Sequence, residues 1–358
     1  MRLAPVSSSV VLIFLSACTS ARHPRSSGRV VDAGAEPDPS GVPYLWYAGG
    51  ALSAFTRAQT LATNDDGPEW QVVPDLPVHN THDLAFDGGG NLWTIPIDGD
   101  RIVRLPADRL TALAPVIPDL VLTSPALVGP VGLLFDAAGN LWVLNFNGAG
   151  PSVASIVCFA DPRGLTGEQT VSPSLTIKPG PTPDEASRFM QASAIAFDAQ
   201  GNLWLSAVAD VLRLDHAGSL MGGVTAAPSA VLATGESYGS LAFDGTGSLW
   251  VTAAQSGRYF ALRFSEPGQL AGAVAPTPVA RVRLSVTGAT FAGGLAFDGL
   301  GGLWIATSAA LVKLAHADDA SGEVSTPPAV TLGRVAFPDL TSKVVIRPTP
   351  PGLPVFAP

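Results

Sequence analysis

Three residues, His82, Asp83 and Asn145, have side chains suited to acid–base chemistry, and they lie near two copies of a repeated sequence pattern. His82 and Asp83 are adjacent in the chain, and Asn145 follows Trp142 by three positions. A histidine titrates near neutral pH, and a neighbouring carboxylate or amide can orient it as a general base. His82, Asp83 and Asn145 are therefore the candidates for a catalytic site. The alternative is that they are polar loop residues whose hydrogen bonds go to the backbone.

One ten-residue pattern occurs five times and carries the fold prediction. It reads two apolar residues, Phe-Asp, a short turn and then Leu-Trp, and it ends at Trp93, Trp142, Trp204, Trp250 and Trp304. A sixth Leu-Trp pair stands at Leu45 and Trp46 without the upstream half. Successive tryptophans are 47, 49, 62, 46 and 54 residues apart. Segments that superimpose without gaps at such a period indicate a repeat architecture.

Each copy of the pattern predicts a hairpin, with two further strands downstream. Apolar residues alternate with period two before the aspartate, as in a half-buried strand, and Asp-x-x-Gly supplies a turn. After Trp204, for example, residues 211–214 and 230–232 are predicted strands. Four strands in a period of about 40–60 residues make one propeller blade. We therefore predict an all-β protein, a six-bladed β-propeller.

The missing half of the first repeat predicts closure of the ring by the C-terminus. The N-terminal blade has residues 44–46 as its second strand but no first strand, so a C-terminal segment must supply one and remove the exposed edge. Residues 335–337 and residues 353–356 are the two candidates. We favour residues 353–356, because their end would lead directly into a Leu-Trp equivalent.

The repeated tryptophans and aspartates are predicted to be structural. One large ring per blade, next to the turn, can fill the wedge between neighbouring sheets. The turn aspartates could suggest calcium sites, but each is a single carboxylate followed by small residues, and calcium takes six or more oxygens. Capping of the turn is the expected role of Asp87, Asp136, Asp198, Asp244 and Asp298.

The Phe-Asp-x-x-Gly-Asn-Leu-Trp hairpin resembles NHL-type repeats and the related bacterial propellers that include virginiamycin B lyase and the regucalcin and gluconolactonase family. The resemblance covers residues 42–358 and implies the architecture, while the activities of such propellers range from lyase and lactonase to simple binding. It implies an alternative function as a metal-assisted lactonase or lyase, with Ca or Mg at the channel mouth. Only one blade brings an imidazole or carboxylate there, at His82-Asp83, so neither family's catalytic set transfers to this chain.

The connections of the predicted blades define two different faces. The uniform Asp-x-x-Gly turns lie on one face, whereas the second-to-third and fourth-to-first connections vary and lie on the other. Functional residues concentrate on variable loops held by a rigid scaffold. We therefore predict a binding module that acts through this variable face, with no metal ligand and no cofactor. The binding candidates are His79, Asn80, Asn147, Tyr238 and Arg258.

The N-terminus reads as a bacterial lipoprotein signal. Arg2 is followed by a short apolar run, residues 10–15, which is too short to span a bilayer. The run ends in Leu-Ser-Ala-Cys, which resembles a lipobox and implies a signal peptide over residues 1–17 and lipidation of Cys18. Residues 18–41 are predicted to be the lipidated cysteine and a flexible linker, and residues 42–358 the propeller. Because Thr19 follows the cysteine, we expect the outer membrane in a Gram-negative cell envelope.

The charge composition of the chain limits the kinds of partner that it can bind. The formal net charge of −9 argues against nucleic acid, which requires concentrated Lys and Arg. We expect a monomer that meets the membrane through its lipid and binds a protein, peptide or glycan. The other cysteine, Cys158, lies in an apolar run and is expected to be a buried hydrophobe.

Overall fold

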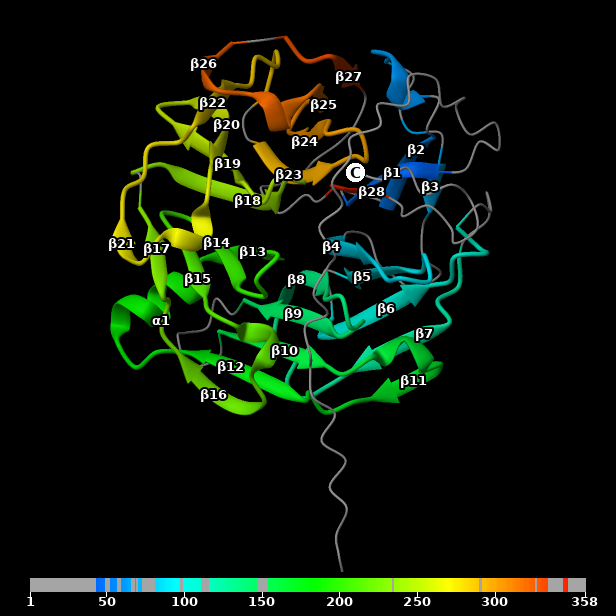
Figure 1. Ribbon diagram of the computed structural model, residues 1–358. Coiled ribbons are helices and arrows are strands. Elements are labelled where there is room, and N and C mark those ends of the chain that lie inside the picture. The colour runs from blue at the N-terminus through cyan, green and yellow to red at the C-terminus, as the bar shows by residue number, and fades with distance from the viewer. Residues whose placement is uncertain are drawn as a thin grey trace, which may run out of the picture.

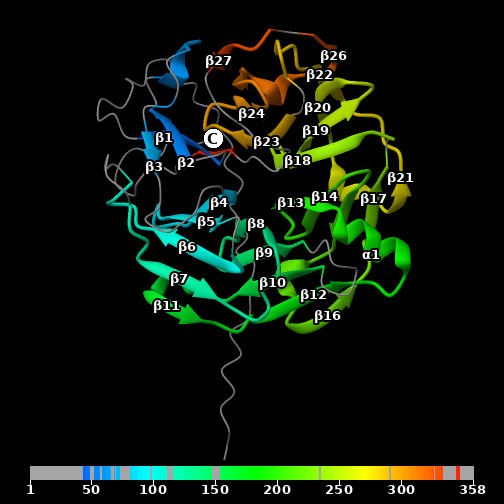
Figure 2. The same ribbon diagram turned by 180° about the vertical axis from the view of Figure 1, so that it is seen from behind.

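The computed structural model describes residues 43–48, 52–56, 59–65, 68, 70–72, 81–96, 99–110, 116–146, 154–233, 235–289, 292–325, 327–333 and 344–346. The described strands form six sheets arranged as the blades of a β-propeller around a central axis (Figures 1 and 2). The predicted all-β, six-bladed architecture is thereby confirmed. The predicted signal peptide, Cys18 and the linker lie outside the described residues.

Each blade has four antiparallel strands, which are named below in their order from the central axis outward. Blade 1 consists of β28 (Val344–Ile346), β1 (Pro43–Ala48), β2 (Leu52–Thr56) and β3 (Trp70–Val72). Blade 2 consists of β4 (Thr81–Phe86), β5 (Leu92–Pro96), β6 (Arg101–Leu105) and β7 (Leu120–Thr123). Blade 3 consists of β8 (Pro130–Phe135), β9 (Leu141–Asn145), β10 (Ser155–Phe159) and β12 (Leu175–Pro179).

The remaining blades repeat the plan. Blade 4 consists of β13 (Ala192–Phe197), β14 (Leu203–Ala207), β15 (Val211–Leu214) and β17 (Ala230–Leu232). Blade 5 consists of β18 (Ser237–Phe243), β19 (Leu249–Gln255), β20 (Arg258–Phe264) and β22 (Ala280–Arg283). Blade 6 consists of β23 (Ala292–Phe297), β24 (Leu303–Thr307), β25 (Leu311–Leu314) and β27 (Val330–Leu332).

The repeated tryptophans fill the interior between blades, as predicted. All six are at most 1% exposed. Trp93 meets Phe135 of the following blade edge to face, with ring centroids 5.3 Å apart and planes at 65°. The same pairing recurs from blade to blade through Trp142, Trp204 and Trp250. Edge-to-face contacts of this kind add to the free energy gained by burying the rings.

The C-terminal part of the chain closes the ring at its inner edge, although not through the favoured segment. β28 pairs with β1 in antiparallel fashion, with Trp46 opposite Val345 and Leu45 opposite Ile346. The choice of residues 353–356 was wrong, since Val344–Ile346 already occupies this edge of β1. Both earlier candidates lie outside the described residues. The physical reason is β-branching, which suits Val-Val-Ile to a sheet, whereas residues 353–356 include Pro354, which cannot donate to a ladder.

A second set of contacts joins the blades at the outer rim. The connection between the third and fourth strands of a blade sends a short strand back to the preceding blade, where it pairs in parallel with the outermost strand. These clasp strands are β11 (Gly167–Thr170), β16 (Gly222–Ala226), β21 (Gly272–Val274) and β26 (Gly322–Val324). Each begins at a glycine with positive φ, between 66° and 74°.

Short helical turns lead into the clasp strands. They are η2 (Pro162–Gly164), η3 (Ala217–Ser219), η4 (Pro267–Gln269) and η5 (Ala317–Asp319). The equivalent turn of blade 1 is η1 (Gln59–Leu61), after which Asn64 bridges in parallel to Leu332 of blade 6. The ring is therefore closed twice, by β28 on the inside and by Asn64 at the rim.

Candidate functional site

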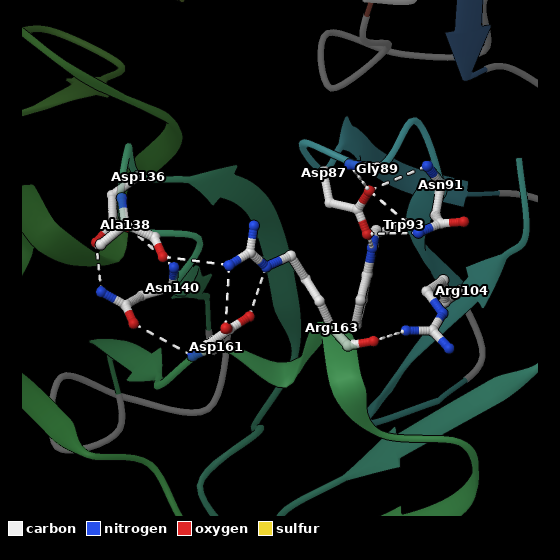
Figure 3. Close-up of polar contacts among 10 residues, drawn as sticks. All are labelled: Asp87, Gly89, Asn91, Trp93, Arg104, Asp136, Ala138, Asn140, Asp161 and Arg163. Atoms are coloured by element: carbon white, nitrogen blue, oxygen red, sulfur yellow. Dashed lines mark hydrogen bonds and ion pairs between the residues drawn. The ribbon is translucent and has the colours of Figure 1, made fainter. Parts of the chain in front are cut away.

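The turn aspartates cap their hairpins and also hold the tryptophans. In blade 2 the Asp87 Oδ1 accepts hydrogen bonds from the backbone amides of Gly89 (2.9 Å) and Asn91 (3.0 Å), while Oδ2 accepts one from the Trp93 indole Nε1 at 2.8 Å (Figure 3). The other four blades with this pattern repeat the indole bond at 2.8–3.3 Å. The predicted capping role is confirmed. The spacing Asp-x5-Trp is the sequence signal of the additional indole bond.

Arg163 brings a positive charge to this turn face, between the turns that begin at Asp87 and Asp136 (Figure 3). Its guanidinium forms an ion pair with Asp161 at 2.5 Å, and its backbone carbonyl accepts a hydrogen bond from Arg104 of the preceding blade. The Arg163 side chain holds the pKa of Asp161 below its ordinary value, and Asp161 raises the pKa of Arg163. The turn face is thus stabilised by contacts within itself.

Third-strand cations connect neighbouring blades on the same side of the ring. Arg104 donates to the Leu165 carbonyl at 2.9 Å, and Arg213 donates to the Gly268 carbonyl at 2.9 Å. Both guanidinium groups lie over the tryptophan of their own blade, 5.5 Å from the Trp93 ring centroid in the first case. These two arginines therefore attach blades 2 and 4 to the segments that lead into the clasp strands of the following blades.

Among the catalytic candidates, Asp83 ties blade 2 to blade 3. The side chain lies on β4 and Asp83 is 5% exposed. Its Oδ1 accepts from the backbone amide of Leu84 at 2.8 Å, and Oδ2 accepts from that of Leu133 on β8 at 2.7 Å. Both carboxylate oxygens are thus used by the scaffold. His82 lies beside it on β4 and is half-buried.

Asn145 is fully buried and holds connections of blade 3. Its Nδ2 donates to the Ala126 carbonyl (2.8 Å) and to the Ser155 hydroxyl (3.0 Å), and its Oδ1 accepts from the Val128 amide (3.3 Å). Asp83 and Asn145 therefore serve different parts of the scaffold, and each has structural partners for its polar atoms.

The same kind of bond joins the inner strands of later blades. The Ser193 and Ser206 hydroxyls both donate to the Gly239 carbonyl, at 2.8 and 3.0 Å. The Thr252 hydroxyl accepts from the Ser240 amide and donates to the Gly293 carbonyl. The sequence shows an imidazole or carboxylate at the first-strand entry of one blade only, at His82-Asp83. It does not show that the small residues at the equivalent positions form a belt of bonds between blades.

The channel mouth does not fit the divalent cation of the alternative function. The one carboxylate predicted there, Asp83, accepts backbone N–H bonds on both oxygens, whereas calcium and magnesium require several oxygens free to converge. Across the described ranges, no group of three or more His, Cys, Asp or Glu side chains could hold a metal ion.

The binding candidates differ in how the structure places them. His79, Asn80 and Asn147 lie outside the described residues. Tyr238 is on β18 opposite Ala253, and its side chain is not among those described. Arg258 is exposed at the start of β20. Cys158 is buried in the core, as predicted.

One pattern in the sequence resembles a catalytic motif but was not among the predicted site residues. Residues 235–239 read Gly-Glu-Ser-Tyr-Gly, which matches the Gly-x-Ser-x-Gly of hydrolases. In those enzymes the serine stands on a sharp turn between a strand and a helix. Here Ser237 is the first residue of β18 and pairs with Ala254 of β19, so the context of a nucleophile elbow is lacking.

The variable face carries polar groups that do not repeat from blade to blade. The long insertion before blade 4 contains α1 (Pro183–Met190), which Thr182 and Glu185 cap reciprocally. Arg188 of this helix pairs with Asp210 at 2.8 Å. Before blade 5, buried Glu236 pairs with Arg281, whose guanidinium lies 3.9 Å from the Phe260 ring centroid.

Blade 5 also has a hollow on the variable face, with a volume of about 320 Å³. It lies between the turn from β19 to β20 and the connection that follows β22. Arg258, Tyr259, Arg283, Ser285 and Thr287 are among its lining residues. Arg258 was predicted to bind a ligand, whereas Arg283 was not among the binding candidates.

Fold and repeat together define the class as a six-bladed β-propeller, and comparison with solved structures agrees. A protein of unknown function from Bacteroides caccae matches with a TM-score of 0.55 and 14% identity, over 86% of this chain and all of the other. Virginiamycin B lyase from Staphylococcus aureus matches with 0.45 and 13%, over 79% of this chain and 84% of the lyase. A periplasmic gluconolactonase from Pseudomonas aeruginosa matches with 0.47 and 14%, over 76% and 79%.

The likeness to the Bacteroides caccae protein supports the fold alone. Lyase and gluconolactonase propellers, the families named by the resemblance of the repeat, are among the structural neighbours. No protein-family model and no curated protein sequence matches the chain. None of the described helices is long and apolar enough to cross a membrane.

Proposed function

We propose that this protein is an exported, lipid-anchored propeller that binds a ligand through its variable face and does not act as an enzyme. One contrast supports the proposal. The described polar groups of the turn face and of the inner strands, such as Asp87 and Asp83, are largely used in bonds within and between blades. The variable face carries ion pairs that differ from blade to blade, and it also has a hollow lined by exposed Arg258 and Arg283, which form no ion pair within the described residues. Functional residues concentrate on such variable loops.

The face itself can be tested with a photo-reactive amino acid. p-Benzoylphenylalanine replaces Val208 on the variable face or Met221 in a third-to-fourth connection on the opposite side. These positions are matched, since both are exposed apolar residues, at 50% and 54%. In cells we expect cross-linked products from position 208 and none from position 221. Products from position 221 alone, or none from either, would contradict the proposal.

An assay for lactone and lyase turnover tests the absence of catalysis. The proposal expects no turnover above background by the full-length protein. Turnover that is lost in His82→Ala but kept in His316→Ala, whose histidine is in a rim turn, would replace binding by catalysis.

Lipid anchoring rests on residues 15–18 and on the length of chain that follows. The first strand begins at Pro43, and residues 19–42 separate it from Cys18. Labelling with radioactive palmitate should mark the full-length protein, and Cys18→Ala should abolish the label and release the protein from membranes. Equal labelling of both proteins would rule out this anchor.

A further inference from the structure

The hollow at the variable end of blade 5 combines a suitable size with two cationic side chains. Its volume of about 320 Å³ lies at the lower end of the range of small-molecule sites, roughly 300–1,000 Å³. Residues 257–259 and residues 283–289 supply its walls. A small molecule, or one unit of a polymer, fits a space of this size.

Arg258 and Arg283 line the hollow and are exposed, and neither forms an ion pair within the described part of the chain. This is unusual in a chain with a net charge of −9, where carboxylates outnumber cations. Most other described arginines do have acidic partners. The ion pairs are Arg104 with Asp119, Arg163 with Asp161, Arg188 with Asp210, Arg213 with Asp215, Arg263 with Asp244 and Arg281 with Glu236.

Sheet register places a third arginine beside these two. Arg281 and Arg283 are two positions apart on β22, so they project from the same face of the sheet. Phe260 stands opposite Arg283 and lies under the Arg281 guanidinium, and Arg258 is two positions before Phe260. Three guanidinium groups therefore share one end of one face of blade 5.

The carboxylate of Glu236 does not neutralise this charge fully. Glu236 is 6% exposed and its Oε1 is engaged by Arg281, which also donates to Gln255 at 3.0 Å. Glu236 thus compensates Arg281 and fixes its position. Arg258 and Arg283 have no ion-pair partner among the described residues, so both can bind an anion that enters the hollow.

Building on the proposed function, we propose that this hollow binds the oxyanion group of a small molecule. Arg258 and Arg283 supply guanidinium donors, whose planar fork matches a carboxylate, sulfate or phosphate group. The hydroxyl-bearing residues Ser285 and Thr287 line the same space and add hydrogen-bonding capacity. The ligand is therefore an organic anion that also carries polar substituents.

Isothermal titration calorimetry of the full-length protein tests the site by measuring its affinity for inorganic phosphate, sulfate and succinate, each as a separate probe. We expect saturable binding of at least one probe, weakened roughly tenfold or more in Arg258→Ala/Arg283→Ala. The matched control is Arg109→Ala, an exposed arginine on the turn side that does not line this hollow. Wild-type affinity in the double variant, or no saturation by any probe up to about 50 mM, would overturn the proposal.

Two further comparisons identify the chemical class of the anion and the groups that bind it. Preference for succinate over phosphate and sulfate identifies a carboxylate ligand, and the reverse identifies a phosphate or sulfate. Arg258→Lys/Arg283→Lys keeps both charges, so its binding should fall if the guanidinium forks contact the anion. Failure of all probes while position 208 still forms cross-links would overturn the anion site and leave the proposed binding face intact.

Discussion

The Oδ2 atom of Asp198 accepts a hydrogen bond from the indole Nε1 of Trp204 at 2.8 Å, and this bond joins the start of the hairpin turn to the second strand of the hairpin. Asp198 Oδ1 meanwhile accepts from two turn amides, those of Gln200 and Asn202. One carboxylate therefore both shapes the turn and fixes the ring that fills the gap between blades. The repeat conserves this pair because the turn and the wedge are built by the same side chain.

Replacing the Asp198 carboxylate by an amide should destabilise the fold, although the two groups have almost the same size. Asp198→Asn can keep the turn bonds through its remaining oxygen, but its amide would face the indole N–H with a second donor. We expect a loss of about 1.5–3 kcal/mol in the free energy of unfolding, the usual cost of a lost bond to a charged group. Urea denaturation measures it. Asp108→Asn, an exposed aspartate, should change stability by less than about 0.5 kcal/mol.

Arg213 should control the stability of the outer rim between blades 4 and 5. It donates to the carbonyls of Pro267 and Gly268, which precede the clasp strand β21. Arg213→Met keeps much of the packing over Trp204 but loses both bonds, so we expect faster hydrogen exchange at the amides of Gly272–Val274 and a stability loss of about 2 kcal/mol. Unchanged exchange in β21 would show that the rim contact is independent of the arginine. Arg109→Met is the control.

Closure by β28 predicts a large effect of a charge at its buried position. Val344 is 3% exposed and packs with Tyr47 and Phe55 of blade 1. Val344→Asp would bury an unpaired carboxylate, so we expect a loss of several kcal/mol or a failure to fold. Val279→Asp at a 37% exposed site on the outer rim should be tolerated. If Val344→Asp melts like the wild type, closure by this strand is not needed for the fold.

The ion pair between Asp161 and Arg163 predicts a contribution to stability that depends on pH. Arg163 lowers the pKa of Asp161 in the folded protein, so the contribution is present above the unfolded pKa of about 3.9 and is lost as pH falls through the lower, folded value. Unfolding free energies at pH 6 and near pH 3 should differ less in Asp161→Asn than in the wild type. Asn suits the site because Asp161 has a positive φ of 26°. A steeper acid loss in the variant would contradict this assignment.

The hairpins could be predicted because their information is local. Asp87, its turn glycine and Trp93 lie within seven residues, and the same spacing returns in four more blades. The clasp strands are harder to see, since β16 and β21 are short, rich in glycine and mostly exposed. Their signal is a second period: Gly222, Gly272 and Gly322 recur at intervals of 50 residues and all have positive φ.

The candidate site could be predicted only in part from the sequence, because the pairing of strands decides which of its residues meet. Asp83 and Asn145 are polar residues near a predicted channel, and nothing local reveals that β8 and the connections of blade 3 use their polar atoms. Arg258 was singled out from its variable connection. Arg283 was not, since only the pairing of β20 with β22 shows that the two arginines meet at one hollow.

Closure by two distant segments has a consequence for synthesis. β1 is among the first strands to leave the ribosome, and its partner β28 is the last described strand to be made. Until residue 346 emerges, β1 and the rim of blade 6 present unpaired backbone edges, which can pair with a second nascent chain. A prematurely ended chain would thus be a template for exchange between copies. Export before folding would keep these edges apart until the whole ring can assemble at once.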